Sequence, residues 1–218
     1  FLMRDDFFAG MGKAHPLVDL ELIAQDALIL NDVSLSQLTL AAGDSSSASA
    51  IAAWLNTESS ATGVTVTASN SIEASAEEIN LLEQIRINGV LIGNGSLPAN
   101  IDSLATAINA ETSTTNVSAY VSREGGIIIT NAVGHEGENI SLSNPDASAT
   151  SNTLGQPNQT FTGSLQLHGT EQVRFTFGAS GVPADLSVLG LRTGIFINGA
   201  ATEELAVFVT GVNSANIA

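Results

Sequence analysis

Cysteine is absent from this chain of 218 residues, which excludes a disulfide framework and a thiolate metal site. Basic residues are scarce: 6 Lys and Arg stand against 22 Asp and Glu, giving a formal net charge of −16. A surface of this sign repels nucleic acid and anionic membrane, so neither is expected as a partner. No apolar run approaches the roughly 18 residues of a membrane helix, and we expect the chain to be soluble.

The N-terminal residues lack the pattern of a signal peptide. The chain begins at Phe1 rather than Met, and Asp5 and Asp6 stand where a signal peptide needs uncharged apolar residues. We therefore expect a segment of a longer polypeptide. Hydrophobic residues make up 44% of the chain, which is enough for a core, whereas charged residues make up only 13%. The polar surface must then consist mostly of Ser, Thr, Asn and Gln.

Aromatic residues are few and unevenly placed. Between Ala9 and Thr160 only Trp54 and Tyr120 occur, whereas the end of the chain contains Phe161, Phe175, Phe177, Phe196 and Phe208. The intervening segment SNPDASATSNTLGQPNQT is dense in residues that favour turns and bury little. The composition of the core therefore changes near residue 155, and we predict a loop or linker at 147–160.

The middle of the chain contains the clearest secondary-structure pattern. Alternating apolar and polar residues, then Gly89 and a short apolar run, predict a hairpin. A helix should follow, because Asn100 is a plausible N-cap and apolar residues recur at spacings of three and four, namely at Ile101, Leu104, Ala105 and Ile108. Strands at 117–121 and 127–130, joined by the turn REGG, complete the order strand, helix, strand, strand.

A degenerate copy of this order precedes it. ALILND (27–32) corresponds to QIRING (84–89), SSASAIAAWLN (46–56) to NIDSLATAINA (100–110), and GVTVTASN (63–70) to NVSAYVSR (116–123). Self-similarity of this kind predicts a duplication, with the two helices and their following strands in equivalent settings. The first copy departs from the second where Leu-Asn replaces Ile-Asn and Asn-Asp replaces Asn-Gly. No clear second strand follows VTVTASN.

The end of the chain has the pattern of β-structure. SLQLHGTEQVRFTFG alternates apolar and polar residues, and RTGIFINGAATEELAVFVTG predicts two more strands around a turn. We predict an α+β, β-rich fold in which small antiparallel sheets are each covered by a helix and are followed by an all-β region. The predicted divisions are a lead-in segment at 1–26, the degenerate unit at 27–83, the better-matched unit at 84–146, the loop or linker at 147–160 and the β-rich region at 161–218.

Several short motifs occur together in the second unit. They are the strand end ING at 87–89, the helix end AINA at 107–110 with its Ile-Asn pair, the strand at 117–121, and the segments GGIIIT and GHEGENISL. In this combination residues 85–142 resemble the hook IN motif of flagellins and flagellar hook-associated proteins. The resemblance implies a structural, extracellular segment from the outer part of a bacterial flagellar protein involved in motility. It also implies contacts with other flagellar subunits through parts of the parent chain outside this sequence.

A second interpretation stays open. The same β-rich units could belong to a binding module of a bacterial surface adhesin, whose loops contact carbohydrate or a host protein. Terminal heptad helices in the parent chain would favour the flagellum, whereas tandem β-sandwich repeats and a secretion signal would favour the adhesin.

Patterns that indicate catalysis or metal binding are weak. Ser45, in AAGDSSS, matches the nucleophile block of GDSL-type hydrolases, but the later Asp-x-x-His block is absent and such a nucleophile needs a histidine base and an acid. His135, Glu136 and Glu138 carry metal-ligand side chains, but the flanking glycines indicate an exposed turn, and a metal site needs at least three convergent ligands. We therefore predict no enzyme, and assign no catalytic, cofactor-binding or metal-binding residue.

Overall fold

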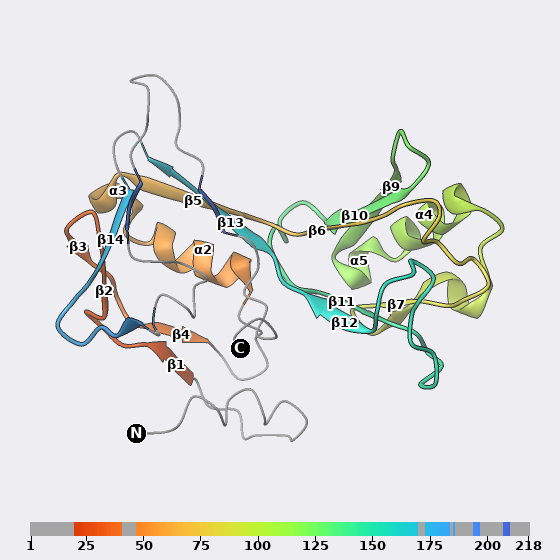
Figure 1. Ribbon diagram of the computed structural model, residues 1–218, viewed down its shortest axis with the longest axis horizontal. Helices are drawn as coiled ribbons and strands as arrows, with labels where there is room; N and C mark the ends of the chain where they lie inside the picture. Colours follow the sequence, from red (N-terminus) through yellow and green to blue (C-terminus); the bar gives the residue numbers. More distant parts are fainter. Residues whose placement is uncertain are drawn as a thin grey trace. The chain divides into compact units, whose positions relative to one another are not determined.

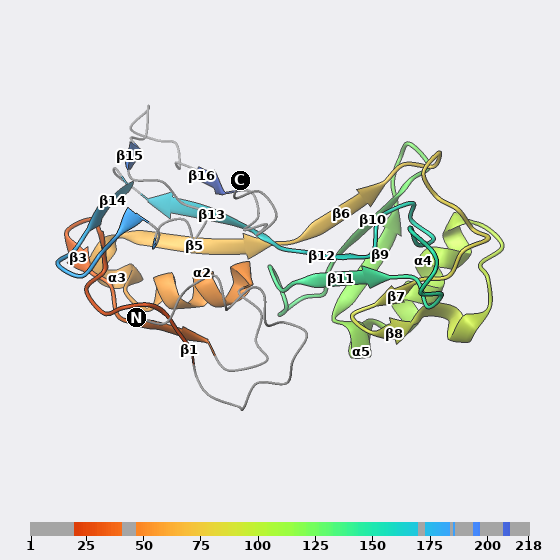
Figure 2. The same ribbon diagram turned by 60° about the horizontal axis from the view of Figure 1, so that its bottom comes forward.

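The computed structural model, shown in Figures 1 and 2, describes residues 20–40, 47–169, 173–183, 185, 194–196 and 207–209. Contacts divide the chain into two compact units. Unit 1 comprises Phe1–Thr67 and Leu165–Ala218, and unit 2 comprises Ala68–Ser164. The chain therefore leaves unit 1, forms all of unit 2 and returns. Unit 1 is discontinuous in sequence, whereas the divisions predicted from composition are consecutive.

Unit 2 contains two small antiparallel sheets. The strand order is β6-β10-β9 in one sheet and β12-β11-β7-β8 in the other. The strands are β6 (Ser71–Ala74), β7 (Arg86–Ile87), β8 (Val90–Leu91), β9 (Val117–Val121), β10 (Ile127–Asn131), β11 (Ile140–Ser143) and β12 (Gln159–Phe161). The predicted hairpin is present as β7 and β8, and the two strands predicted around REGG are β9 and β10.

A helical segment connects the two sheets of unit 2. It consists of the 3-10 helix η1 (Ile92–Gly95), α4 (Ile101–Ala110) and the short α5 (Thr112–Thr115). Asn100 is the N-cap of α4, as predicted: its Oδ1 accepts the Ser103 N–H at 2.8 Å, and the Ser103 hydroxyl accepts the Asn100 N–H at 3.0 Å. In Figure 2, α4 lies beside β9, and the two elements pack against each other.

The apolar stripe of α4 faces the core of unit 2. Leu104, Ala105 and Ile108 are buried, as their spacing predicts, together with isoleucines of β10 and β11. Burial of each large apolar side chain contributes roughly 1.5–3 kcal/mol, so the packing of α4 against the sheets stabilises the unit substantially. Leu154 is 0% exposed and belongs to the same core, which places the irregular segment 147–160 inside the folded unit rather than between two regions.

Unit 1 is built from the remaining strands and a second helical segment. The strand orders are β1-β4, β16-β13-β5 and β15-β14-β2-β3. The elements are β1 (Leu20–Ile23), β2 (Leu28–Leu30), β3 (Val33–Ser34), β4 (Leu38–Leu40), α2 (Ala48–Asn56), α3 (Ser59–Thr62), β5 (Val64–Ser69), β13 (Ser164–Gly169), β14 (Val173–Phe177), β15 (Gly194–Phe196) and β16 (Val207–Val209). The α+β, β-rich prediction is confirmed. The strands predicted at 161–218 are present, but they pair with β2 and β5 instead of forming a separate all-β region.

The helix of unit 1 resembles α4 in its start and its buried face. The Ser47 hydroxyl caps α2 by accepting the Ala50 N–H at 3.2 Å. Ile51 and Leu55 are buried, and the indole N–H of Trp54 donates to the Ser36 carbonyl at 3.1 Å. In Figure 2, α2 runs alongside β5.

Two sheets of each unit have the same spatial order of strands. The order β15-β14-β2-β3 of unit 1 corresponds to β12-β11-β7-β8 in unit 2, and β16-β13-β5 corresponds to β6-β10-β9. The chain order differs for one strand, because β6 precedes the other strands of unit 2 whereas β16 follows the other described strands of unit 1. In unit 2 a short turn joins β9 to β10, whereas the equivalent strands of unit 1, β5 and β13, are separated by the whole of unit 2. This explains why no second strand of the first copy was recognisable after VTVTASN. The strand β6 that does follow belongs to unit 2.

Candidate functional site

The asparagine of the Ile-Asn pair joins the end of α4 to the neighbouring strand. The Asn109 Nδ2 donates to the Ala119 carbonyl, and the Ala119 N–H donates to Asn109 Oδ1, both at 2.8 Å. A side-chain amide thus makes the two hydrogen bonds that a strand residue would otherwise make. Because β9 is an edge strand of its sheet, these bonds occupy backbone groups that face away from β10.

A second asparagine connects three segments of unit 2. Asn88 has a φ of 49° and Gly89 a φ of 83°, as a two-residue hairpin turn with left-handed central residues requires. The Asn88 Nδ2 donates to the Thr115 carbonyl at 2.7 Å, while Asn88 Oδ1 accepts the Ser141 N–H at 2.8 Å. The hairpin is therefore fixed to the end of α5 and to β11.

Unit 1 has the same two arrangements. The Asn56 Nδ2 donates to the Val66 carbonyl at 2.7 Å and Asn56 Oδ1 accepts the Val66 N–H at 2.8 Å. The Asn31 Nδ2 donates to the Thr62 carbonyl at 2.9 Å, and Asn31 Oδ1 accepts the Arg174 N–H at 2.8 Å. These bonds support the predicted duplication.

The shared bonds correct the alignment of the two helices by one residue. Pairing 46–56 with 100–110 matches Asn56 with Ala110, but by its bonds Asn56 is the equivalent of Asn109. The turn of unit 1 also keeps its shape without glycine, because Asp32 adopts a φ of 66° where unit 2 has Gly89. The replacement of Asn-Gly by Asn-Asp is therefore a change of residue and not of turn type.

The junction between helix and strand is completed by a threonine and a left-handed residue. Thr115 Oγ1 accepts the Val117 N–H at 3.3 Å, and Asn116 between them has a φ of 59°. In unit 1, Thr62 Oγ1 accepts the Val64 N–H at 3.2 Å, and Gly63 has a φ of 68°. Asparagine and glycine are the residues that adopt this conformation most readily at the end of a helix.

We refer to the set Asn88, Asn109 and Thr115 as the amide latch of unit 2, and to Asn31, Asn56 and Thr62 as that of unit 1. Each latch fixes a helix end, a hairpin and an edge strand with side-chain bonds to backbone. Sequence reasoning identified ING and AINA as motifs but gave their asparagines no role. Aligning the two copies on Asn31 with Asn88 and on Asn56 with Asn109 would have indicated one, because both positions keep asparagine.

The three candidate metal ligands do not converge. His135 Nδ1 lies 2.8 Å from Glu138 Oε1, whereas both carboxylate oxygens of Glu136 accept the Gly134 N–H, at 3.0 and 3.1 Å. Glu138 Oε2 in turn accepts from the Asn116 side chain at 3.3 Å. Within the described part of the chain, no three His, Asp or Glu side chains are grouped as metal ligands. The cluster is an ordered turn.

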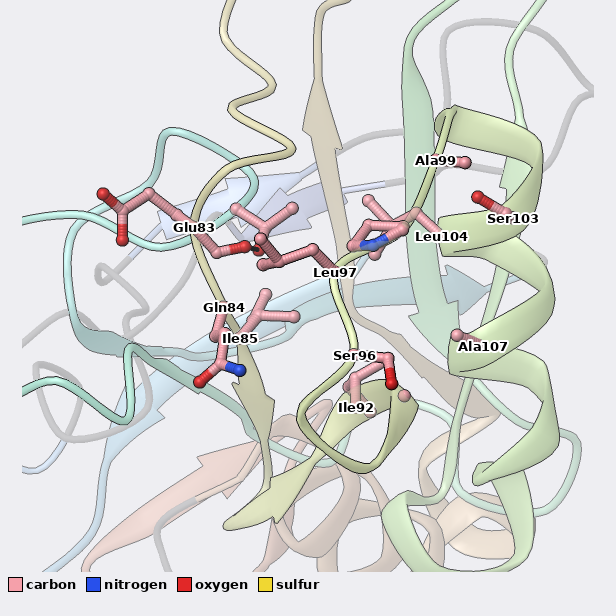
Figure 3. Close-up of a pocket in the computed structure, with 13 residues that line it drawn as sticks. Glu83, Gln84, Ile85, Ile92, Ser96, Leu97, Ala99, Ser103, Leu104 and Ala107 are labelled. Carbon is pink, nitrogen blue, oxygen red and sulfur yellow. Dashed lines mark hydrogen bonds between the residues drawn. The ribbon is translucent and has the colours of Figure 1, made fainter.

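The candidate nucleophile Ser45 lies outside the described residues. A pocket of about 200 Å³ lies between the start of β7 and α4 (Figure 3). Its two longest polar side chains already have partners: Gln84 Nε2 donates to the Gly95 carbonyl at 2.6 Å, and Glu83 Oε2 accepts from Asn144 at 2.8 Å. The pocket has a largely apolar wall that includes Ile92 and Leu97, and its lining contains no histidine.

Hydrogen bonds lower the pKa of exposed carboxyl groups in the loops of unit 2. The Ser75 N–H and then the Ser75 hydroxyl donate to Glu78 Oε2, at 2.8 and 2.9 Å, and hold the pKa of Glu78 below its ordinary value of 4.5. The Ser148 hydroxyl and N–H lower the pKa of Asp146 in the same way. These bonds fix the local backbone of the two loops that contain Glu78 and Asp146.

A dependence of stability on pH follows from Glu78. Because its pKa is lower in the folded chain, its contribution to stability is present above pH 4.5 and is lost as the pH falls through the folded-state value. Wild type should therefore lose stability relative to Glu78→Gln on acidification, measured by urea denaturation between about pH 6 and pH 3. Glu77→Gln is the control, because it removes the same charge without removing a hydrogen bond. Parallel pH profiles for wild type and Glu78→Gln would contradict the assignment.

Comparison with known proteins identifies one family motif. The family model described as the flagellin hook IN motif matches residues 84–133, which contain the amide latch and α4. No curated protein matches the chain. Among the described helices, none has the length and apolarity to cross a membrane. The resemblance of residues 85–142 to the flagellin hook IN motif is therefore confirmed over residues 85–133.

Proposed function

We propose that this chain is a non-enzymatic, surface-exposed segment of a bacterial flagellar filament or hook-associated protein. The single observation that carries this proposal is the match of residues 84–133 to the hook IN motif, whose helix α4 packs into the buried core of unit 2. The parts of the parent chain outside this sequence make the contacts with other flagellar subunits. The module itself acts as a stable, extracellular scaffold.

The surface chemistry supports this role. The chain carries a net charge of −16 with few charged residues overall, so its loops are hydroxyl-rich and acidic. Such a surface keeps neighbouring copies from associating through the displayed units while another part of the parent polymerises. The latch supports the same conclusion, because it occupies edge-strand groups that could otherwise pair with a second copy.

Immunogold electron microscopy of the bacterium that produces the parent chain tests the location. An antibody raised against residues 68–164 should label the flagellum, either along its length or at the junction or cap. Cells that lack the gene provide the control for specificity. Labelling confined to the cell body would overturn the flagellar proposal and would favour the surface adhesin, whose binding to carbohydrate or a host protein can then be measured with the same chain.

An esterase assay tests the absence of catalysis. We expect no turnover of short-chain ester substrates by the wild-type chain and no difference on Ser45→Ala. Turnover that Ser45→Ala abolishes would require a hydrolase instead.

A further inference from the structure

The turn between β9 and β10 of unit 2 corresponds to a much longer connection in unit 1. It joins Val121 to Ile127, which face each other across the two strands. The equivalent strands in unit 1 are β5 and β13, and the chain between them is the whole of unit 2. The same position therefore holds a short turn in one copy and a folded domain in the other.

The geometry at β5 and β13 shows why unit 1 tolerates its insertion. Thr67 Oγ1 lies 3.3 Å from His168 Nε2, and the hydroxyl oxygens of Ser69 and Ser164 lie 3.2 Å apart. The second contact is further along β5 but earlier in β13, so the strands are antiparallel neighbours at the point where the chain leaves and returns. An insertion whose two ends lie side by side leaves such a strand pair intact.

The turn of unit 2 offers the same geometry. The Ser122 N–H donates to the Gly126 carbonyl at 2.8 Å, so the two ends of the turn are adjacent. Arg123 and Glu124, at its tip, are exposed, and within the described residues neither side chain makes a hydrogen bond or ion pair. A Cβ added at Gly125 would meet nothing within 4 Å.

Gly126, the next residue, has no free space for a side chain. A Cβ at Gly126 would lie 2.4 Å from the Ala74 carbonyl oxygen, so Gly126 is packed against the backbone of β6. The β7–β8 hairpin of unit 2 should not tolerate an insertion, because Asn88 in its turn bonds to both Thr115 and Ser141. Free space and adjacent ends therefore coincide at the tip formed by Arg123 and Glu124.

We propose that the β9–β10 turn is an insertion site of unit 2. At this position unit 2 accepts a further peptide or folded domain for display without loss of its own fold. The inference rests on the correspondence of the strand pair β9–β10 with β5–β13 and does not depend on the flagellar assignment. An insert here would be connected to unit 2 through β9 and β10, just as unit 2 is connected in sequence to unit 1 through β5 and β13.

Insertion into the full chain tests the proposal. One variant receives a small folded domain with adjacent termini between Arg123 and Glu124, flanked by short Gly-Ser linkers, and a second receives a Gly-Ser peptide alone at the same place. The matched control carries the same inserts between Asn88 and Gly89. Hydrogen exchange of the β9, β10 and β11 amides measures the fold of unit 2, and the inserted domain reports its own folding separately.

We expect exchange protection within about threefold of the parent chain for both inserts at Arg123–Glu124, because the cost of a longer loop rises slowly with length. The control inserts should lower protection about 100-fold or more, since they break the bonds of Asn88. Loss of protection of that size with the Gly-Ser peptide at Arg123–Glu124 would overturn the proposal, as would equal tolerance at Asn88–Gly89.

Discussion

Substituting Ile108 by alanine is expected to lower the free energy of unfolding of unit 2 by about 3 kcal/mol, within the range for large-to-small changes in a packed core. Ile108 is 0% exposed and lies where α4 meets the sheets, so the lost contacts leave a cavity that the β10 and β11 isoleucines cannot fill. Urea denaturation followed by circular dichroism measures the loss, and hydrogen exchange of the β9 amides locates it.

Two matched variants sharpen this experiment. Thr106→Ala changes an exposed residue of the same helix and should alter stability by no more than about 0.5 kcal/mol. Leu55→Ala removes the equivalent core residue of unit 1 and should cost about as much as Ile108→Ala, with fluorescence of the sole tryptophan, Trp54, as the local probe. A loss below about 1 kcal/mol on Ile108→Ala would show that α4 does not seal the core.

The second large effect is expected at the motif asparagine. Asn109→Ala removes both bonds to Ala119 and should cost about 2 kcal/mol, because each bond contributes roughly 1 kcal/mol and the strand groups lose their partners. Exchange of the Ala119 amide should accelerate more than that of other β9 amides. The opened edge lies next to Tyr120, which is 54% exposed, so we also expect concentration-dependent association, measured by light scattering.

Asn109→Asp separates the two bonds of the latch. Aspartate keeps an oxygen that can accept the Ala119 N–H but has no donor for the Ala119 carbonyl, so this variant should lose stability while protecting the Ala119 amide better than Asn109→Ala does. Asn56→Ala is the corresponding variant of unit 1 and should act on Val66. Unchanged exchange at Ala119 in Asn109→Ala would disprove the bridging role of this side chain.

The local elements could be predicted from the sequence because local signals determine them. The hairpin at 85–92 follows from alternation and an Asn-Gly turn, and the start of α4 follows from Asn100 as a cap. The apolar spacing in the helix indicated its buried face correctly. These features depend on residues close together in the chain, so a single sequence is sufficient to identify them.

The discontinuity of unit 1 could not be predicted in the same way. Its β5 and β13 are neighbours in the sheet, but nothing in the composition of either strand indicates a partner so distant in sequence. The change in aromatic content near residue 155 predicts a linear boundary, whereas Leu154 belongs to the core of unit 2. Strand alternation predicts which face is buried, not which strand lies alongside.

The roles of the latch asparagines were missed for a related reason. Asn88 and Asn109 bond to backbone groups of residues that follow them by ten or more positions. Asparagine is also common in turns and at helix ends without such bonds. The residue type alone does not distinguish an asparagine that forms a turn from one that bonds to a distant strand. The alignment of the two copies carried the missing signal, since asparagine occupies both positions in each.

The discontinuity of unit 1 has a consequence for the order in which the chain folds. Unit 2 is continuous in sequence and its contacts are relatively local, so it should fold first. The strand β5 can pair with β13 only after β13 has been synthesised. Once folded, unit 2 holds Ser69 and Ser164 with their hydroxyl oxygens 3.2 Å apart, which removes most of the entropy loss of bringing β5 and β13 together. Folding of unit 2 thereby prepares β5 and β13 to pair and complete unit 1.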